Sequence, residues 1–274
     1  MTRLFISRDS TALSLGAEQV VTAFQQQAAA SGKEIEIVRN GSRGLFWLEP
    51  LVEVETAAGR VAYGPVNPSD VNDLLEAGIL EGKPHPLYLG NIEELAYFKD
   101  QNRLTFARVG LTDPVNIDDY LAHDGYRGLH NALKLQPADI VKQVTDSGLR
   151  GRGGAAFPTG IKWNTVLNAS GEQKYIVCNA DEGDSGTFSD RMIMEGDPFV
   201  LIEGMTIAGL AVGATQGYIY LRIEYPHAKI ALNQAIEAAY ARGYLGENIQ
   251  NSGKTFHLEV RSGAGAYICG EETS

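Results

Sequence analysis

The stretch SGLRGRGGAAFPTGIKW, from Ser147 to Trp163, decides how the second half of this chain is organised. It contains two arginines, a proline, a lysine and five glycines, which are Gly148, Gly151, Gly153, Gly154 and Gly160. Glycine permits positive φ and lets a ligand approach the main chain closely. Backbone N–H groups exposed ahead of a helix form an anion site. The stretch therefore predicts a loop that holds the phosphates of a nucleotide or a flavin.

An ordinary Rossmann fingerprint is a competing interpretation of the same residues. Gly151, Gly153 and Ala156 satisfy G-x-G-x-x-A, but that signature requires a strand before it. The preceding residues, 137–147, place Ile140, Val141 and Val144 at helical spacing instead. The pattern thus favours a phosphate-type loop outside a standard Rossmann unit, and a glycine loop without a ligand would not explain the clustered cations.

Composition limits the class of protein. The chain has 274 residues, enough for two domains, and a net charge of −11. This charge argues against nucleic acid or an anionic membrane surface as a partner. Two cysteines, Cys178 and Cys269, are too few for a disulfide framework and suit a reducing compartment. No apolar run approaches the ~18 residues of a spanning helix, so we expect a soluble, cytoplasmic protein without membrane insertion.

Residues 1–82 predict a small α/β domain. The pattern indicates strands at 3–7, 34–38, 51–56 and 61–64, a helix at 17–30, and a second helix capped by Asn67. This β-α-β-β-β-α order suits a thioredoxin-like fold. Residues 83–136 are expected to be a linker with short helical pieces and one strand at 104–109. The segment GSRGLFWLEPL, from Gly41, is either core or a docking patch, and we favour core.

Residues 137–274 predict a second α/β domain. Strands are expected at 174–178, 216–223 and 256–260, and helices at 199–212 and 226–242. The strand at 174–178 runs into the acidic turn Asn179–Asp184, and such strand ends are where α/β sheets place ligand-contacting groups. A solvated acidic loop is the alternative interpretation of that turn.

At this point the motifs resemble a known family. RGRGGAAFPTGIKW is similar to the flavin- and NAD-binding loop of the NADH-oxidising flavoprotein subunit of respiratory complex I, and of its counterparts in soluble formate dehydrogenases and NAD-reducing hydrogenases. CNADEGDSGTFSDR from Cys178, YIYLRIEY from Tyr218 and GAGAYICGEET from Gly263 agree in the same order. The resemblance covers about half of the chain, and four ordered motifs are a specific signal.

The resemblance implies FMN and NAD as cofactors and assigns residues to them. It implies direct hydride transfer between the cofactors, with no catalytic side chain. The glycine loop and Lys162 would hold FMN with the acidic turn, Gly270 and Glu271, while Phe157 would stack on adenine, Tyr267 would lie beside the nicotinamide and Glu272 would meet a ribose hydroxyl. The implied cofactor-binding residues are Gly151, Arg152, Gly153, Gly154, Phe157, Lys162, Asn179, Asp181, Glu182, Asp184, Tyr267, Gly270, Glu271 and Glu272.

Several features depart from the family pattern. Family members often have glutamate at Asp184 and an aromatic residue at Thr165. The thioredoxin-like module of the family often carries a two-iron cluster on cysteines, whereas this chain has Ser7, Ser42 and Phe46 there. Hydroxyls do not replace cysteine as cluster ligands, so we expect a module that kept the fold and lost the cluster. This version most resembles the flavin-carrying β subunit of soluble NAD-dependent formate dehydrogenases.

The resemblance also implies what surrounds this chain. In the family a ubiquitin-like domain and a helical bundle with a 4Fe-4S cluster follow the position of Ser274, so we expect a fragment. The implied partners are iron–sulfur subunits, namely a small thioredoxin-like 2Fe-2S subunit and a formate-oxidising subunit. A diaphorase subunit of an NAD-reducing hydrogenase or of NADH:quinone oxidoreductase is the alternative, and a non-catalytic assembly subunit is the alternative from another class.

Overall fold

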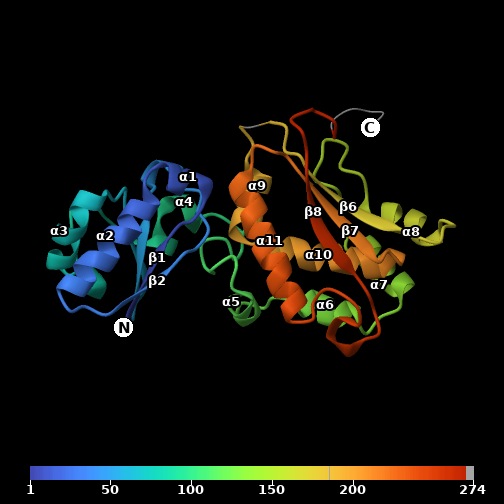
Figure 1. Cartoon of the computed structure of the whole chain (residues 1–274), viewed down its shortest axis with the longest axis horizontal. Helices are drawn as coiled ribbons and strands as arrows, with labels where there is room; N and C mark the ends of the chain where they lie inside the picture. The colour runs from blue at the N-terminus through green and yellow to red at the C-terminus, as the bar shows by residue number, and fades with distance from the viewer. Residues whose placement is uncertain (185, 270–274) are drawn as a thin grey trace. The chain divides into compact units, whose positions relative to one another are not determined.

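The computed structural model describes residues 1–184 and 186–269 and shows two compact units (Figure 1). The first unit comprises Met1–Pro114 with Glu195–Asp197, and the second comprises Val115–Met194 with the chain from Pro198 onward. Within the described residues, no helix is both long and apolar enough to cross a membrane.

The first unit is built on a five-stranded mixed sheet. Its elements are β1 (Thr2–Ile6), α1 (Ser10–Ser14), α2 (Ala17–Ala30), β2 (Ile35–Val38), η1 (Phe46–Leu48), β3 (Val52–Thr56), β4 (Gly59–Tyr63), η2 (Pro68–Asp70), α3 (Val71–Ala77), η3 (Ile79–Glu81), β5 (Tyr88–Asn91), η4 (Ile92–Glu94) and α4 (Ala96–Lys99). The strand order is β2-β1-β3-β4-β5, and only the β1–β2 pair is parallel. Helices α2 and α3 pack on one face of this sheet, and a smaller cluster around Phe98 covers the other.

The predicted elements of this unit formed where the local signal was strong. Helix α2 has the expected bounds, because Val20, Val21 and Phe24 form one buried stripe. Asn67 and Asp70 form a reciprocal capping box ahead of α3. The thioredoxin-like assignment of this unit stays a prediction.

The region expected to be a linker is divided between the two units. Tyr88–Asn91 pairs with β4 as the edge strand β5, so the first unit extends beyond residue 82. The strand expected at 104–109 is wrong, because the segment forms turns. It is followed by Gly110 and Leu111, whose carbonyls accept from the Arg60 guanidinium at 2.9 and 2.7 Å. Side-chain donors, not a strand ladder, fix this part of the chain.

The segment GSRGLFWLEPL is only partly core, which corrects the expectation. Leu45 and Leu51 are buried, but Trp47 is 61% exposed and lies edge-on to Tyr97 with ring centroids 5.3 Å apart. Arg43, within the same segment, is buried instead. The apolar composition of the segment did not reveal that Arg43 would be buried while Trp47, its largest aromatic residue, would be exposed.

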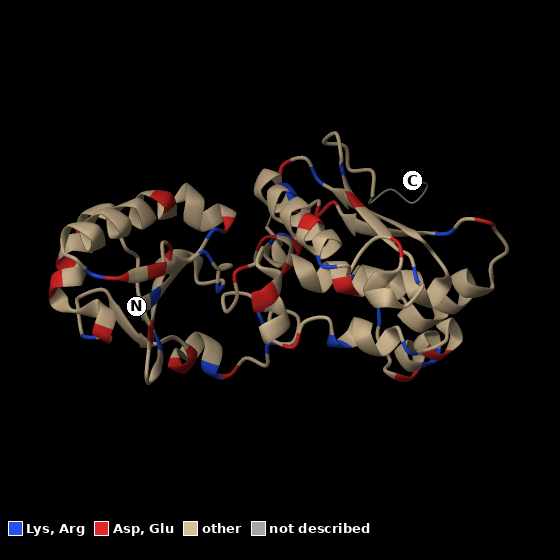
Figure 2. Cartoon of the chain, turned by 60° about the horizontal axis from the view of Figure 1, so that its bottom comes forward, with Lys and Arg blue, Asp and Glu red and all other residues tan. Residues whose placement is uncertain are grey.

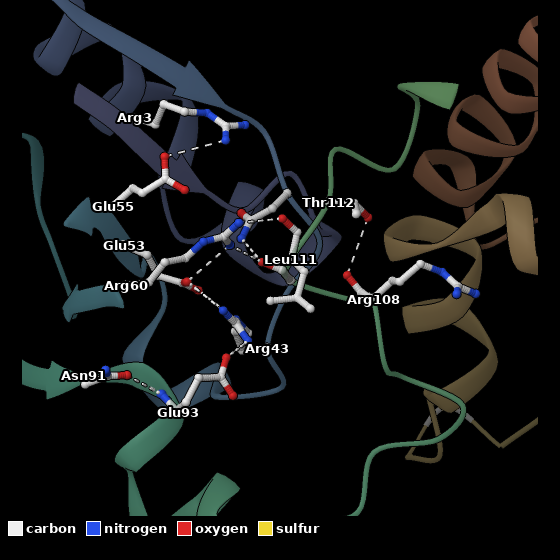
Figure 3. Close-up of polar contacts among 12 residues, drawn as sticks. Arg3, Arg43, Glu53, Glu55, Arg60, Asn91, Glu93, Arg108, Leu111 and Thr112 are labelled. Atoms are coloured by element: carbon white, nitrogen blue, oxygen red, sulfur yellow. Dashed lines mark hydrogen bonds and ion pairs between the residues drawn. The ribbon is translucent and has the colours of Figure 1, made fainter. Parts of the chain in front are cut away.

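Arg43 is held by a buried ion pair (Figure 3). Its guanidinium donates to both carboxylate oxygens of Glu53, at 2.9 and 2.8 Å, and both side chains are 2% exposed. A further donor reaches Glu93 at 2.7 Å. Bidentate geometry of this kind gives orientation as well as energy, whereas removing one partner would leave an uncompensated buried charge.

The second unit is built on a three-stranded parallel sheet. Its elements are α5 (Ile117–Ala122), α6 (Arg127–Ala132), α7 (Pro137–Asp146), α8 (Thr159–Asn168), β6 (Tyr175–Ala180), α9 (Ser189–Gly196, whose last two residues belong to the first unit), α10 (Pro198–Val212), β7 (Gln216–Leu221), α11 (Pro226–Ala241), η5 (Ile249–Asn251) and β8 (His257–Ser262). The order is β6-β7-β8, in register from Tyr175↔Gln216↔His257 to the strand ends. The core lies between this sheet and α10, whose buried residues are mostly apolar.

One face of this parallel sheet is open to solvent in the described chain. Val177 of β6 is 64% exposed, and Tyr175 beside it is exposed as well. Their neighbours on β7, Gln216 and Tyr218, are half-buried. Parallel sheets are usually covered on both faces, so this side is unusual for its class.

Glu49 of the first unit provides a pH-dependent prediction. Burial raises the pKa of its carboxyl from 4.5 to about 7, against the opposing hydrogen bonds from the Leu51 N–H and the Ser42 hydroxyl. A carboxyl whose pKa is raised in the folded state contributes stability that is complete below pH 4.5 and is lost as the pH rises through 7. We expect the free energy of unfolding to fall by roughly 2–3 kcal/mol over this window, and Glu49→Gln to remove most of the fall.

Urea unfolding at several pH values tests this, followed by Trp47 fluorescence in a Trp163→Phe background. Glu94→Gln is the matched control, because Glu94 is exposed. A wild-type stability that is flat between pH 5 and 8, or a fall that persists in Glu49→Gln, would contradict the prediction.

Candidate functional site

The glycine-rich stretch forms a closed loop between α7 and α8. The Gly151 N–H donates to the Phe157 carbonyl at 2.8 Å, and the Thr159 N–H donates to the Leu149 carbonyl at 2.9 Å. Arg150 and Pro158 form an antiparallel bridge at the neck of the loop. The loop is therefore fixed at its base by its own backbone, and its tip is presented outward.

The glycines at the tip do not serve internal packing. A Cβ atom placed on Gly153 or Gly154 would meet nothing within 4 Å. Phe157, at the far side of the loop, is 49% exposed. Open space beside glycine backbone is what a ligand that contacts the main chain requires. The loop therefore fits the expectation of a cradle for a bound group.

The cations of the loop divide into two kinds. Arg150 is used internally, because its Nε donates to the Ala156 carbonyl at 2.7 Å. The side chains of Arg152 and Lys162 are exposed, and neither forms an ion pair or hydrogen bond with the described residues. In a chain of net charge −11, whose carboxylates are spread over both units (Figure 2), two cations without a carboxylate partner suit a phosphate group.

Gly160 fixes the start of α8. A Cβ at this position would lie 2.2 Å from the Thr145 hydroxyl oxygen and 2.6 Å from its Cα, so α7 and α8 meet through bare backbone. Lys162 lies two residues further along the same turn of helix. The glycine therefore sets where the lysine of the loop lies.

The acidic turn lies at the carboxyl edge of the sheet. Because β6, β7 and β8 are parallel and in register, Ala180, Leu221 and Ser262 end side by side. The segments that follow them gather at one end of this unit, where Figure 1 also shows the yellow-green glycine-rich loop. The glycine-rich loop thus lies at the same end of this unit as the carboxyl ends of the strands.

Glu182 is the buried member of the turn, with 8% of the residue exposed. Its Oε1 accepts from the Ser189 hydroxyl at 3.2 Å and from the Asp190 N–H at 3.0 Å. Its Oε2 accepts from the Arg191 N–H at 3.2 Å and from the Tyr225 hydroxyl at 3.0 Å. The carboxylate therefore caps the start of α9, a helix that the sequence interpretation missed.

The other predicted members of the turn are more accessible. The Asn179 side-chain oxygen accepts from the Asp181 N–H at 3.1 Å, and Asp184 accepts from the Gly186 N–H at 2.9 Å. Gly183 lies under the Tyr267 ring, because a Cβ there would be 2.8 Å from a ring carbon. The structure thus brings Tyr267, predicted from a distant motif, onto the acidic turn.

A small pocket of about 90 Å³ opens at this contact. It is lined by Asp181, Gly183, Arg222, Glu224, Gly265, Ala266 and Tyr267. Arg222 and Tyr225 were not predicted as site residues, although YIYLRIEY was recognised as a motif. Gly270, Glu271 and Glu272 lie outside the described residues.

Burial and nearby charge shift several pKa values at this end of the unit. Burial, and then the charge of Asp190, raise the pKa of the Cys178 thiol to about 11. Burial, followed by the Glu182 charge, raises the pKa of Asp190. Burial and the charge of Asp181 raise the pKa of Cys269. Both thiols are thus poor nucleophiles near neutral pH.

The sequence is similar to flavoproteins over its second half. Residues 144–274 match the Nuo51 FMN-binding domain. The NADP-reducing hydrogenase subunit HndC of Solidesulfovibrio fructosivorans is 53% identical over 64% of this chain and 36% of its own length. An NADH-quinone oxidoreductase subunit of Escherichia coli is 49% identical over 59% of this chain and 37% of its own length. A chain of an NAD+-reducing [NiFe]-hydrogenase superposes with a TM-score of 0.49 at 24% identity, over 99% of this chain and 44% of that one.

The matched domain is an FMN-binding domain, and the two relatives are subunits of a hydrogenase and of an NADH-quinone oxidoreductase. The described residues contain no group of three or more His, Cys, Asp or Glu side chains arranged to hold a metal ion. The chain spans less than half the length of the curated relatives that it matches.

Gly160→Ala tests the helix contact that orients the loop. The added methyl group overlaps backbone as well as side chain of Thr145, so α8 must move, and we expect a loss of about 1–3 kcal/mol in the stability of the second unit. Thermal unfolding of the variant measures this, with Gly171→Ala as the control, because a Cβ at Gly171 meets only an ordinary contact at 3.8 Å. Equal melting temperatures for the two variants would show that the contact is not tight.

Proposed function

We propose that this chain is the diaphorase part of a multisubunit oxidoreductase, which exchanges electrons between a nicotinamide dinucleotide and an iron–sulfur chain through FMN. The observation that carries the proposal is the match of residues 144–274 to an FMN-binding domain, in a structure whose glycine loop is open at its tip. When bound, FMN would accept a hydride from the nicotinamide and release electrons singly. The role of the chain itself would be to bind the two cofactors and to orient them toward each other.

The phosphate end of FMN would lie at the glycine loop. Gly151, Gly153 and Gly154 offer backbone without side chains, while Arg152 and Lys162 offer cations without a carboxylate partner in the described chain. Charge-assisted hydrogen bonds to phosphate are roughly twice as strong as neutral ones. The donor set therefore fits a phosphate monoester.

The ring end of FMN would lie at the carboxyl edge of the sheet. Asn179, Asp181 and Asp184 have accessible polar groups there. Glu182 would act by its charge and by holding the turn, because its carboxylate is already used by internal donors. Gly270 and Glu271 would complete the site.

The nicotinamide dinucleotide would use the exposed aromatic residues. Phe157 offers an exposed ring for adenine, and Tyr267 lies exposed on the acidic turn for the nicotinamide. No described side chain is needed as a nucleophile or proton base, because the chain's role is to hold the two reacting rings together and exclude water between them. Glu272 would accept a hydrogen bond from the adenosine ribose.

The electron partner is the finer part of the proposal. Formate oxidation is inferred from the cysteine-free first unit, in which Ser7 and Ser42 are buried and hydrogen-bonded to neighbouring groups. The relatives named above belong to a hydrogenase and to a quinone oxidoreductase, so both remain alternatives. Metal analysis of the purified complex separates the formate and hydrogen alternatives, because molybdenum or tungsten indicates a formate-oxidising partner and nickel a hydrogen-oxidising one.

Purification of the full-length protein tests the central proposal. We expect the yellow absorbance of a bound flavin, identified as FMN after release, and reduction of ferricyanide that depends on NADH. A colourless protein that takes up no added FMN would overturn the proposal in favour of a non-catalytic assembly subunit.

Lys162→Ala tests the phosphate assignment. Loss of a charge-assisted bond to a partly buried anion costs about 1.5–3 kcal/mol, so the dissociation constant of FMN should rise by one to two orders of magnitude. Lys229→Ala, at an exposed position on α11, is the control and should bind FMN as the wild type does. Equal dissociation constants for the two variants would assign Lys162 another role.

Glu272→Gln tests the choice of nicotinamide. A carboxylate accepts hydrogen bonds from free ribose hydroxyls but repels the 2′-phosphate of NADP. We expect a preference for NADH in the wild type, and a rise of about tenfold in kcat/KM for NADPH in the variant, with a smaller loss for NADH. A variant that loses stability and keeps the wild-type ratio would show that Glu272 only caps a helix.

A further inference from the structure

Two residues that follow β7 form hydrogen bonds with the acidic turn that follows β6. The Tyr225 hydroxyl donates to Oε2 of Glu182 at 3.0 Å, and the Arg222 guanidinium donates to the Glu182 main-chain carbonyl. The Arg222 guanidinium carbon also lies 4.9 Å from the centre of the Tyr225 ring. One residue of the turn is therefore held at both its side chain and its backbone from a neighbouring strand end.

Both carboxylate oxygens of Glu182 are fully used as hydrogen-bond acceptors in this arrangement. Each oxygen accepts two hydrogen bonds, three of the four donors belong to the first residues of α9, and the fourth is Tyr225. Burial, and then the hydrogen bond to Glu182, raise the pKa of Tyr225 to about 12, so the hydroxyl stays a donor at neutral pH. The phenol thus links the turn, α9 and the end of β7.

These hydrogen bonds to Glu182 also restrain the accessible residues of the turn, because those residues are joined to Glu182 through the main chain. Asp181 precedes Glu182 and Gly183 follows it, under the Tyr267 ring. Asp181, Gly183, Tyr267 and Arg222 all line the small pocket at the carboxyl edge. A displacement of Glu182 must therefore move Asp181 and the surface that supports Tyr267.

We propose that Tyr225 and Arg222 are positioning residues for the flavin site and act through Glu182. The inference rests on the proposed function, because it takes the acidic turn as the flavin-facing segment. Neither residue needs to touch the cofactor. Their effect is to fix where the Asp181 carboxylate lies relative to the ring end of the site.

Tyr225→Phe is the most specific test of this proposal, because it removes one hydroxyl and keeps the ring against which the Arg222 guanidinium lies. Tyr218→Phe is the matched control, since Tyr218 lies on β7 and its hydroxyl forms no hydrogen bond with the described residues. Both variants, Glu182→Gln and the double variant Glu182→Gln/Tyr225→Phe are compared in the full-length protein. The readouts are the dissociation constant and the midpoint potential of FMN, with the melting temperature of the apoprotein.

We expect Tyr225→Phe to weaken FMN binding by about tenfold, the loss typical of one hydrogen bond to a charged group. The midpoint potential of the bound flavin should rise, because a displaced Asp181 carboxylate opposes reduction less. The double variant should bind FMN no more weakly than Glu182→Gln alone, since Tyr225 acts only through Glu182. Tyr218→Phe should match the wild type in both readouts.

Three results would overturn the inference. A Tyr225→Phe variant with the wild-type dissociation constant and midpoint potential of FMN would show that the Tyr225–Glu182 hydrogen bond does not affect the flavin site. Additive losses in the double variant would show that Tyr225 acts independently of Glu182. If the wild-type protein itself binds no FMN, the proposed function fails as well, which distinguishes that failure from the other two.

Discussion

The parallel direction of β6, β7 and β8 is the constraint on which the second unit depends. Parallel strands in register end at one edge, so segments distant in the chain are brought together there. The acidic turn follows the first strand, Arg222 and Tyr225 follow the second, and the segment that carries Tyr267 follows the third. The motifs that follow the three strands lie at one edge because the strands share a direction.

The first unit depends on a different constraint, because it buries charged side chains in its interior. Arg43 and Glu53 are held bidentately, and Arg60 packs against Phe5 with its guanidinium carbon 3.3 Å from the ring centre. Ser42 and Glu49 form a hydrogen-bonded pair close by in the chain. Such polar groups are costly unless every partner is present, so this interior depends on matched neighbours rather than on volume alone.

The sequence predicted elements well where the signal is local, and less well where it depends on a partner. The stripe of Val20, Val21 and Phe24 was sufficient to give α2 its bounds. Residues 104–109 have a strand pattern but form turns, and the carbonyls of Gly110 and Leu111 just after them accept from the Arg60 guanidinium instead of a strand ladder. The edge strand β5 lies in a proline-broken segment which the pattern alone assigned to a linker.

The same distinction separates the parts of the candidate site. The glycine loop and the acidic turn could be found from residue types, because glycine next to cations and acids at a strand end each have a local meaning. The position of Glu182 could not, because its decisive partner, Tyr225, lies 43 residues away. A motif names the residues of a turn, but only the packing decides which carboxylate faces inward to cap a helix and which stay free for a ligand. In this turn the Glu182 carboxylate is used by the fold, whereas Asp181 is half-buried and Asp184 is exposed, with Oδ1 accepting from the Gly186 N–H.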